Sequence, residues 1–167
     1  MKLIQQPDSS FELSLKLLML ERNNMINTQK NLPSPDDTER SERLREIFEH
    51  LHDVNKTVPV IVEGKKDASA LRSLGLIGDI IILHNGSSLY DFCDDISRRF
   101  PKVVLLMDWD KRGETLHKTL SNHLNGHWEE FSSYREILKI LCQKDIHQIE
   151  SIPKLLNRLE GNEGPWQ

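Results

Sequence analysis

Three acidic residues stand at the ends of apolar runs, where the sequence predicts that buried strands stop. Glu63 ends the apolar part of VPVIVEG, and Asp108 and Asp110 close VVLLMDWD. Mg²⁺ prefers oxygen ligands, usually takes only a few carboxylates, and fills its remaining positions with water and phosphate oxygens. We therefore expect these three residues to bind Mg²⁺ and to leave some of its positions open to water and phosphate oxygens.

The spacing of the two aspartates also suits a metal site. Side chains alternate between the faces of a strand, so Asp108 and Asp110 should point to one side, with Trp109 opposite, if the strand lasts through Asp110. A carboxylate at the end of a buried strand is costly unless it is solvated, paired or metal-bound. Each acidic residue alone could be a helix cap or an ion-pair partner, but the three together favour a metal site.

Strand and helix patterns alternate three times. VPVIVEG precedes DASALRSLG, DIIILHNG precedes LYDFCDDISRRF, and VVLLMDWD precedes ETLHKTLSNHL. This alternation predicts an α/β fold with a doubly wound, mainly parallel sheet and helices on both faces. Ligands of such folds bind beyond the carboxyl ends of the strands, where all three carboxylates fall. In the first of these helices, Asp67 is the expected N-cap and Gly75 the expected stop signal.

Four segments follow from the patterns. Residues 1–37 are expected to be a disordered tail or the product of a start assigned too early, with a short docking segment as the alternative. Residues 38–56 form an amphipathic helix, 57–127 the α/β core, and 128–160 a helical extension of the same domain.

Composition narrows the class of protein. No apolar run reaches the length of about 18 residues typical of a membrane span, and signal-peptide features are lacking, so we expect a cytoplasmic protein that does not bind membranes. Cys93 and Cys142 are far apart with no CxxC pair, which predicts buried, reduced thiols. The net charge of −4 argues against coating of polyanions, so nucleic-acid contacts must be local or bridged by metal.

Basic residues and glycines follow the acidic motifs and should lie on the same rim. The residues that we expect to contact phosphate or nucleic acid are Lys65, Lys111, Arg112, Gly64 and Gly86. A cationic side chain can take phosphate oxygens around the metal, and a glycine lets the backbone approach a phosphate closely. Solvated charge and tight turns are the alternatives, and for Lys66 solvated charge is favoured.

The motifs also resemble those of a known family. VEG followed by KKD and a helix, HNG after the second strand, and LLMDWDKRGE after the third resemble the TOPRIM domain of topoisomerases, bacterial-type primases and small nucleases such as the 5S ribosomal RNA maturation enzyme. The resemblance covers about residues 58–124, so 57–127 would be a TOPRIM core with a Rossmann-like sheet. With the flanking helices, roughly residues 40–155 look similar to small stand-alone TOPRIM proteins of archaea.

The resemblance implies roles for the matching residues. Glu63 corresponds to the family's glutamate, which binds metal and can move a proton at the scissile phosphate, and Asp108 and Asp110 correspond to its DxD pair. The family's scheme places two Mg²⁺ ions there, and Mn²⁺ is the expected substitute. Arg112 stands where topoisomerases carry a third aspartate, which disfavours a topoisomerase.

Two classes of function stay open, and a third is disfavoured. The first is Mg²⁺-dependent, nuclease-like hydrolysis of RNA or DNA, with Glu63 as general base or second metal anchor. The second is a non-catalytic nucleic-acid-binding or regulatory subunit of a replication, repair or RNA-processing complex, which would need a protein partner. A haloacid-dehalogenase-type phosphatase is disfavoured because its DxD motif normally ends the first strand, whereas DWD ends the third.

Overall fold

The computed structural model describes residues 12, 14–16, 37–83 and 86–162. The chain divides into two units, Met1–Pro35 and Asp36–Gln167. In the first unit the described residues are helical, and the Lys16 ammonium lies 3.9 Å from a Glu12 carboxylate oxygen. The tail predicted for residues 1–37 falls largely outside the described residues. The second unit holds the rest of the described chain.

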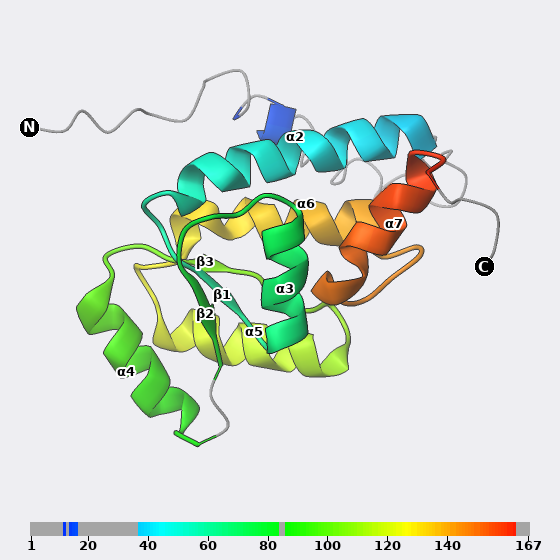
Figure 1. Ribbon diagram of the computed structural model, residues 1–167. Helices are drawn as coiled ribbons and strands as arrows, with labels where there is room; N and C mark the ends of the chain where they lie inside the picture. Colours follow the sequence, from blue (N-terminus) through cyan, green and yellow to red (C-terminus); the bar gives the residue numbers. More distant parts are fainter. Residues whose placement is uncertain (1–11, 13, 17–36, 84–85, 163–167) are drawn as a thin grey trace, which may run out of the picture. The chain divides into compact units, whose positions relative to one another are not determined.

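The second unit is built on three parallel strands. They are β1 (Val60–Val62), β2 (Ile80–Ile82) and β3 (Val104–Leu105), in the order β2-β1-β3 (Figure 1). Val60 pairs with Ile80 on one side and with Val104 on the other. Aliphatic, β-branched residues suit a strand packed on both faces, and all three residues of β1 are fully buried. The first and third predicted strands are therefore neighbours, as the predicted site requires.

Helices connect the strands and flank them. Their bounds are α2 Asp37–Asn55, α3 Lys65–Ser73, α4 Leu89–Arg99, α5 Lys111–His123, α6 Ser132–Cys142 and α7 Ile152–Leu159, with short 3-10 turns η1 Glu129–Phe131 and η2 Ile149–Ser151. Cys93 in α4 and Cys142 at the end of α6 are buried free thiols, as predicted. No helix in the described part of the chain combines the length and apolar character needed to span a bilayer.

Helix α3 begins earlier than the sequence predicts. Its N-cap is Gly64, and Asp67 is the third helical residue, whose carboxylate accepts a hydrogen bond from the Gly64 N–H at 3.1 Å. The prediction of Asp67 as N-cap is therefore wrong, because the side chain reaches back to the cap from inside the first turn. Gly75 has a φ of +103°, a conformation that glycine adopts easily, and its role as stop signal is confirmed.

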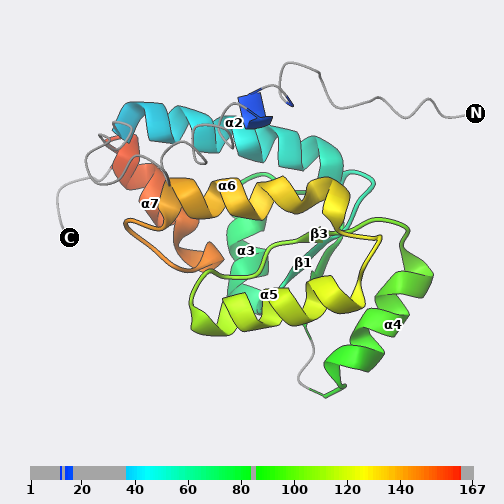
Figure 2. The same cartoon turned by 180° about the vertical axis from the view of Figure 1, so that it is seen from behind.

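Helices cover both faces of the sheet. On one face, Phe92 and Cys93 of α4 and Leu120 of α5 pack in one buried cluster with Ile61 and Leu105. α6 contacts β3, and α2 packs along α6 and α7. Figures 1 and 2 show α2 and α6 on the side of the strands opposite to α5. The prediction of an α/β fold with parallel strands is confirmed, while the doubly wound topology stays a prediction.

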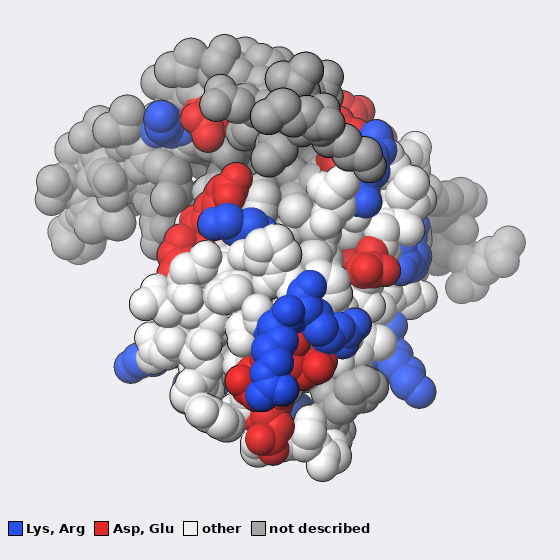
Figure 3. All heavy atoms as spheres, turned by 90° about the vertical axis from the view of Figure 1, so that its left-hand side faces the viewer, with Lys and Arg blue, Asp and Glu red and all other residues white. Residues whose placement is uncertain are grey.

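The surface over α4 carries charges of both signs. Arg98 pairs with Asp94, and Arg99 with Asp95, each four residues earlier on the same helix. Figure 3 shows the face on which α4 lies, where basic side chains lie directly against acidic ones. These charges largely neutralise each other, so the helix does not form a basic patch of the kind that would bind a polyanion.

Candidate functional site

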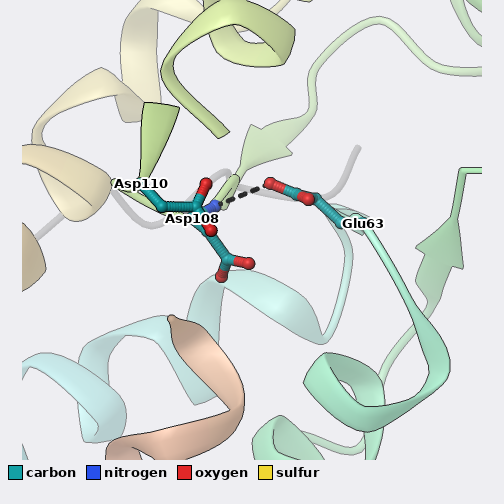
Figure 4. Close-up of side chains that lie close together, drawn as sticks. All are labelled: Glu63, Asp108 and Asp110. Atoms are coloured by element: carbon teal, nitrogen blue, oxygen red, sulfur yellow. Dashed lines mark hydrogen bonds between the residues drawn. The ribbon is translucent and has the colours of Figure 1, made fainter. Parts of the chain in front are cut away.

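Glu63, Asp108 and Asp110 converge at the carboxyl edge of the sheet. Each offers a carboxylate oxygen, and these oxygens lie within 4.8 Å of one another. Figure 4 shows Glu63 approaching from the end of β1 and both aspartates from the segment that follows β3. In the described part of the chain, no other group of three or more His, Cys, Asp or Glu side chains comes together in this way. We call these three residues the carboxylate cluster.

Backbone N–H groups hold one oxygen of each carboxylate. Glu63 Oε1 accepts from the Asp108 N–H at 3.1 Å, Asp108 Oδ1 from the Ile149 N–H at 2.7 Å, and Asp110 Oδ1 from the Gly113 N–H at 2.7 Å. These bonds fix the position of the carboxylates without neutralising them. A carboxylate held by one oxygen can still offer the other to a cation.

Asp110 reaches the cluster by a different route from the one predicted. The strand was expected to last through Asp110, but β3 ends at Leu105. Asp110 is instead the N-cap of α5, with extended backbone angles and its side chain bonded to the Gly113 N–H. Helix capping, rather than strand alternation, therefore places the second aspartate beside the first.

The segment after β3 is held by the chain near η2. The Trp109 indole N–H donates to the Ile146 carbonyl at 2.6 Å, and the Trp109 backbone N–H to the His147 carbonyl at 3.1 Å. The Ile149 N–H completes this set of contacts by donating to Asp108. The predicted C-terminal extension is thus part of the site, because it fixes both the backbone and a carboxylate of the DWD motif.

Burial and mutual repulsion raise the pKa values of these acids. Burial is the main cause that raises the pKa of Asp108 from 3.8 to about 7, and the charges of Asp67, Glu63 and Asp110 raise it further against the opposing Ile149 hydrogen bond. Burial is also the main cause that raises the pKa of Glu63, while the nearby Arg112 charge lowers it. Ionised carboxylates are therefore disfavoured here unless a cation compensates them.

Asp67 is a fourth acid beside the cluster. Its side chain is buried, with 5% exposed. Burial raises its pKa, and the charges of Glu150 and Asp110 add to that effect. From the sequence, only a capping role was predicted for Asp67. Its position in the motif VEGKKD, close to Glu63, was the feature of the sequence that could have indicated a place beside the cluster.

Arg135 of α6 is the main support that the sequence analysis missed. Its side chain is 1% exposed. Its guanidinium donates to the Met107 carbonyl at 2.8 Å and to the Asp108 carbonyl at 2.6 Å. Glu114 lies 3.4 Å from the same guanidinium and accepts from Lys139 at 2.5 Å, so it belongs to this support rather than to the cluster. The feature of the sequence that could have indicated this role is the position of Arg135 on the apolar stripe of SYREILKIL.

Gly113 is the second missed support. A Cβ atom at this position would lie 2.0 Å from the Asp108 carbonyl oxygen, so only glycine lets α5 start so close to the end of the DWD motif. Its N–H also donates to Oδ1 of Asp110, the N-cap of the helix. This glycine therefore sets the distance between the two aspartates and the start of the helix.

The predicted phosphate-contacting side chains surround the cluster to different degrees. Lys65 and Lys111 are exposed and open α3 and α5. Arg112 is exposed and close enough to Glu63 for its charge to lower the pKa of that carboxyl. Within the described ranges, none of the three forms an ion pair with an acidic side chain inside 4 Å. All three cations are therefore available to an anion.

The two predicted glycines differ in what the structure shows. The Gly64 N–H is engaged by Asp67, which fits the turn-forming alternative. Gly86 follows residues 84–85, which lie outside the described residues, and no described contact joins it to the carboxylate cluster. Its predicted role stays a prediction.

Relatives of the chain include archaeal proteins that share one family name. A UPF0292 protein from Methanosarcina barkeri is 32% identical over 126 residues, which cover 72% of this chain and 85% of that protein. A UPF0292 protein from Thermoplasma volcanium is 38% identical over 72 residues, covering 43% of this chain and 60% of that protein. A solved structure from Aquifex aeolicus is 28% identical, with a TM-score of 0.53, covering 65% of this chain and 96% of that one.

These comparisons overturn the TOPRIM assignment. The relatives carry the name UPF0292, and no family model, TOPRIM included, matches the chain. The motifs behind the assignment are short and follow strands, where a parallel α/β fold with an acidic rim places similar residues whatever its family. The prediction of archaeal relatives is confirmed.

Proposed function

Because the chain belongs to the UPF0292 family, a name that states no activity, we propose its function from the geometry: a divalent-cation-dependent protein that acts on nucleic-acid phosphodiesters, by nuclease-like hydrolysis. The observation that carries the proposal is the carboxylate cluster, whose oxygens lie within 4.8 Å of one another. The raised pKa values of Glu63 and Asp108 support it, because acids that repel one another inside a protein call for a compensating cation.

The donor set fits Mg²⁺, with Mn²⁺ as substitute. All three ligand groups are carboxylates, and the cluster contains no histidine or cysteine, so it offers the hard oxygen ligands that these ions prefer. Glu63, Asp108 and Asp110 would hold the ion. When bound, the cation supplies neutralisation of phosphate charge and a water molecule of lowered pKa.

The chain's own residues supply proton transfer and substrate binding. Burial makes the Glu63 carboxylate more basic than usual, which suits it to accept the proton of the attacking water. Arg112 lies beside Glu63 and can take a non-bridging phosphate oxygen, and Lys65 and Lys111 stand at the same edge. α3 and α5 both begin at this edge, so the partial positive charge of their N-termini also favours a bound phosphate.

The proposal is tested first by metal binding. Mn²⁺ is titrated into the protein and the free ion is followed by its electron paramagnetic resonance signal, with Mg²⁺ as competitor. We expect binding by the wild type, and a loss of affinity of roughly 100-fold in Glu63→Gln and Asp108→Asn, because ligand substitutions remove charge and a donor oxygen. Asp95→Asn, which changes an exposed acid on α4, is the matched control and should bind normally.

Turnover is tested with labelled structured RNA, single-stranded DNA and a phosphomonoester. Hydrolysis of RNA or DNA that needs Mg²⁺ and is lost in Glu63→Gln supports the proposal. Metal-dependent binding of nucleic acid without cleavage would leave the non-catalytic subunit as the function. Hydrolysis of the phosphomonoester alone would refute action on phosphodiesters.

A further inference from the structure

A groove lies between α3 and the segment formed by η2 and α7. Its volume is about 430 Å³. Lys66, Ser69 and Ser73 of α3 line one wall, and Glu150, Ser151 and Lys154 line the other. α3 packs against η2 along this boundary. The groove therefore has a basic side chain and hydroxyl groups on both of its walls.

The Ser73 hydroxyl donates to the Ala70 carbonyl at 2.7 Å, but other polar groups of the groove are available to a ligand. Most arginines of this unit are paired with acids, as Arg45 is with Glu160. Lys66 and Lys154, by contrast, are exposed and have no acidic partner among the described residues. Ser151 precedes α7 but makes no side-chain capping bond, and its hydroxyl is free to donate. Two ammonium groups with a hydroxyl nearby match the oxygens of a phosphate group.

The groove and the carboxylate cluster are bordered by the same two segments. The Ile149 N–H of η2 donates to Asp108 Oδ1, and the next residue, Glu150, lines the groove. On the opposite wall, Lys66 lies in the first turn of α3, which begins just after Glu63. The groove therefore continues from the edge at which the cluster lies.

We propose that this groove binds a phosphate of the same nucleic-acid strand, next to the phosphodiester that lies at the carboxylate cluster. The inference rests on the proposed function and specifies its substrate. The strand must extend beyond the reacting bond on the side of α3 and α7. A dinucleotide, which has a single phosphodiester, would reach the cluster without filling the groove, whereas a longer strand would fill both.

The test compares two double variants of equal charge. Lys66→Ala with Lys154→Ala removes both groove cations, and Lys118→Ala with Lys144→Ala removes two exposed lysines outside the groove lining. Binding of a labelled single-stranded oligonucleotide is measured by fluorescence anisotropy over a range of salt concentrations, with Ca²⁺ replacing Mg²⁺ to limit turnover. The groove variant should bind about tenfold more weakly, with a salt slope lower by about one to two, because each lost phosphate contact removes about one from the slope.

Several outcomes separate this inference from the proposed function. Equal affinity and salt slope in the two double variants would overturn the groove, even if Mn²⁺ binding and cleavage persist. Competition by inorganic phosphate as effective as that by an unlabelled strand would overturn it too, because it would show a small-anion site. If the wild type binds no oligonucleotide, the groove inference is overturned as well. The inference is supported if the groove variant binds the oligonucleotide more weakly but keeps the Mn²⁺ affinity and the dinucleotide affinity of the wild type.

Discussion

The α4 surface and the carboxylate cluster use the same residue type in opposite ways. On α4, Asp95 is exposed to solvent and Asp94 is half-buried, and each pairs with an arginine one helical turn later. In the cluster, Asp108 is only 6% exposed and faces other acids, and its pKa is raised to about 7. Acids on α4 are neutralised within their own helix, whereas those of the cluster are held together by the fold. Among the described residues, only the second arrangement leaves its acids without an ion pair.

The arginines of the two regions also differ in burial and partners, and the largest expected loss of stability comes from replacing the buried one, Arg135. Arg135→Met removes the donors of the Met107 and Asp108 carbonyls and leaves Glu114 without its buried partner. We expect a loss of about 3–5 kcal/mol in the free energy of unfolding, as for other broken buried pairs. Urea denaturation measures it, with Arg99→Met as the matched change on α4. Similar losses in both variants would contradict the comparison.

Mg²⁺ should stabilise the protein only when the cluster is ionised. A cation bound to the folded state alone adds about 2.7 kcal/mol at a hundredfold excess over its Kd. Because the pKa of Asp108 is about 7, protons compete with the ion below that pH, so the stabilisation should grow as the pH rises from about 6 to about 8. Thermal unfolding with and without Mg²⁺ measures this effect. Stabilisation independent of pH would place the ion elsewhere.

Without metal, Asp108→Asn should make the protein more stable. An acid whose pKa is raised from 3.8 to about 7 by folding binds more protons in the folded state, so stability falls as the pH rises through that window. Removing the charge should raise the free energy of unfolding by about 2 kcal/mol near pH 8 and by little near pH 4. The value near pH 8 is smaller than the free energy that corresponds to a shift of about three pKa units, about 4 kcal/mol. Chemical denaturation in chelator at both pH values measures it. A destabilised variant at the higher pH would show a structural role for the charge.

The smallest effect is expected on α4. Asp95→Asn or Arg99→Gln removes an exposed ion pair within one helix, which is worth less than about 0.5 kcal/mol. High salt should reduce even this difference, because it screens exposed charges. Denaturation curves at low and high salt are the measurement. A larger loss would mean that the α4 pairs contribute to the fold as the cluster's supports do.

The sequence predicted the parts of the fold that local pattern determines. β-Branched runs marked the strands, and the ends of parallel strands meet at one edge, so the meeting of Glu63 with Asp108 could be foreseen. Asp110 also arrives there, but through helix capping, because β3 stops at Leu105. The TOPRIM assignment was wrong, because short motifs at strand ends indicate an acidic rim on a parallel α/β fold and do not identify the family of the protein.

The supports of the site could not be predicted from one sequence. Arg135 reaches the Asp108 carbonyl across 27 residues, and the Ile149 N–H reaches the Asp108 carboxylate across 41. No local pattern encodes such distant contacts. The role of Gly113 could not be predicted either. A residue without a Cβ is required there because α5 begins very close to the end of the DWD motif, and that approach depends on the fold.

The contact between Ile149 and Asp108 also sets an order of events during synthesis. All three residues of the carboxylate cluster leave the ribosome before α6 and η2 do, since the chain is made from its amino end. Until Ile149 has emerged, Asp108 lacks the N–H that fixes its carboxylate, and Arg135 and the partner of Trp109 arrive only shortly before. A nascent chain therefore carries the three carboxylates well before it carries the contacts that hold them in place.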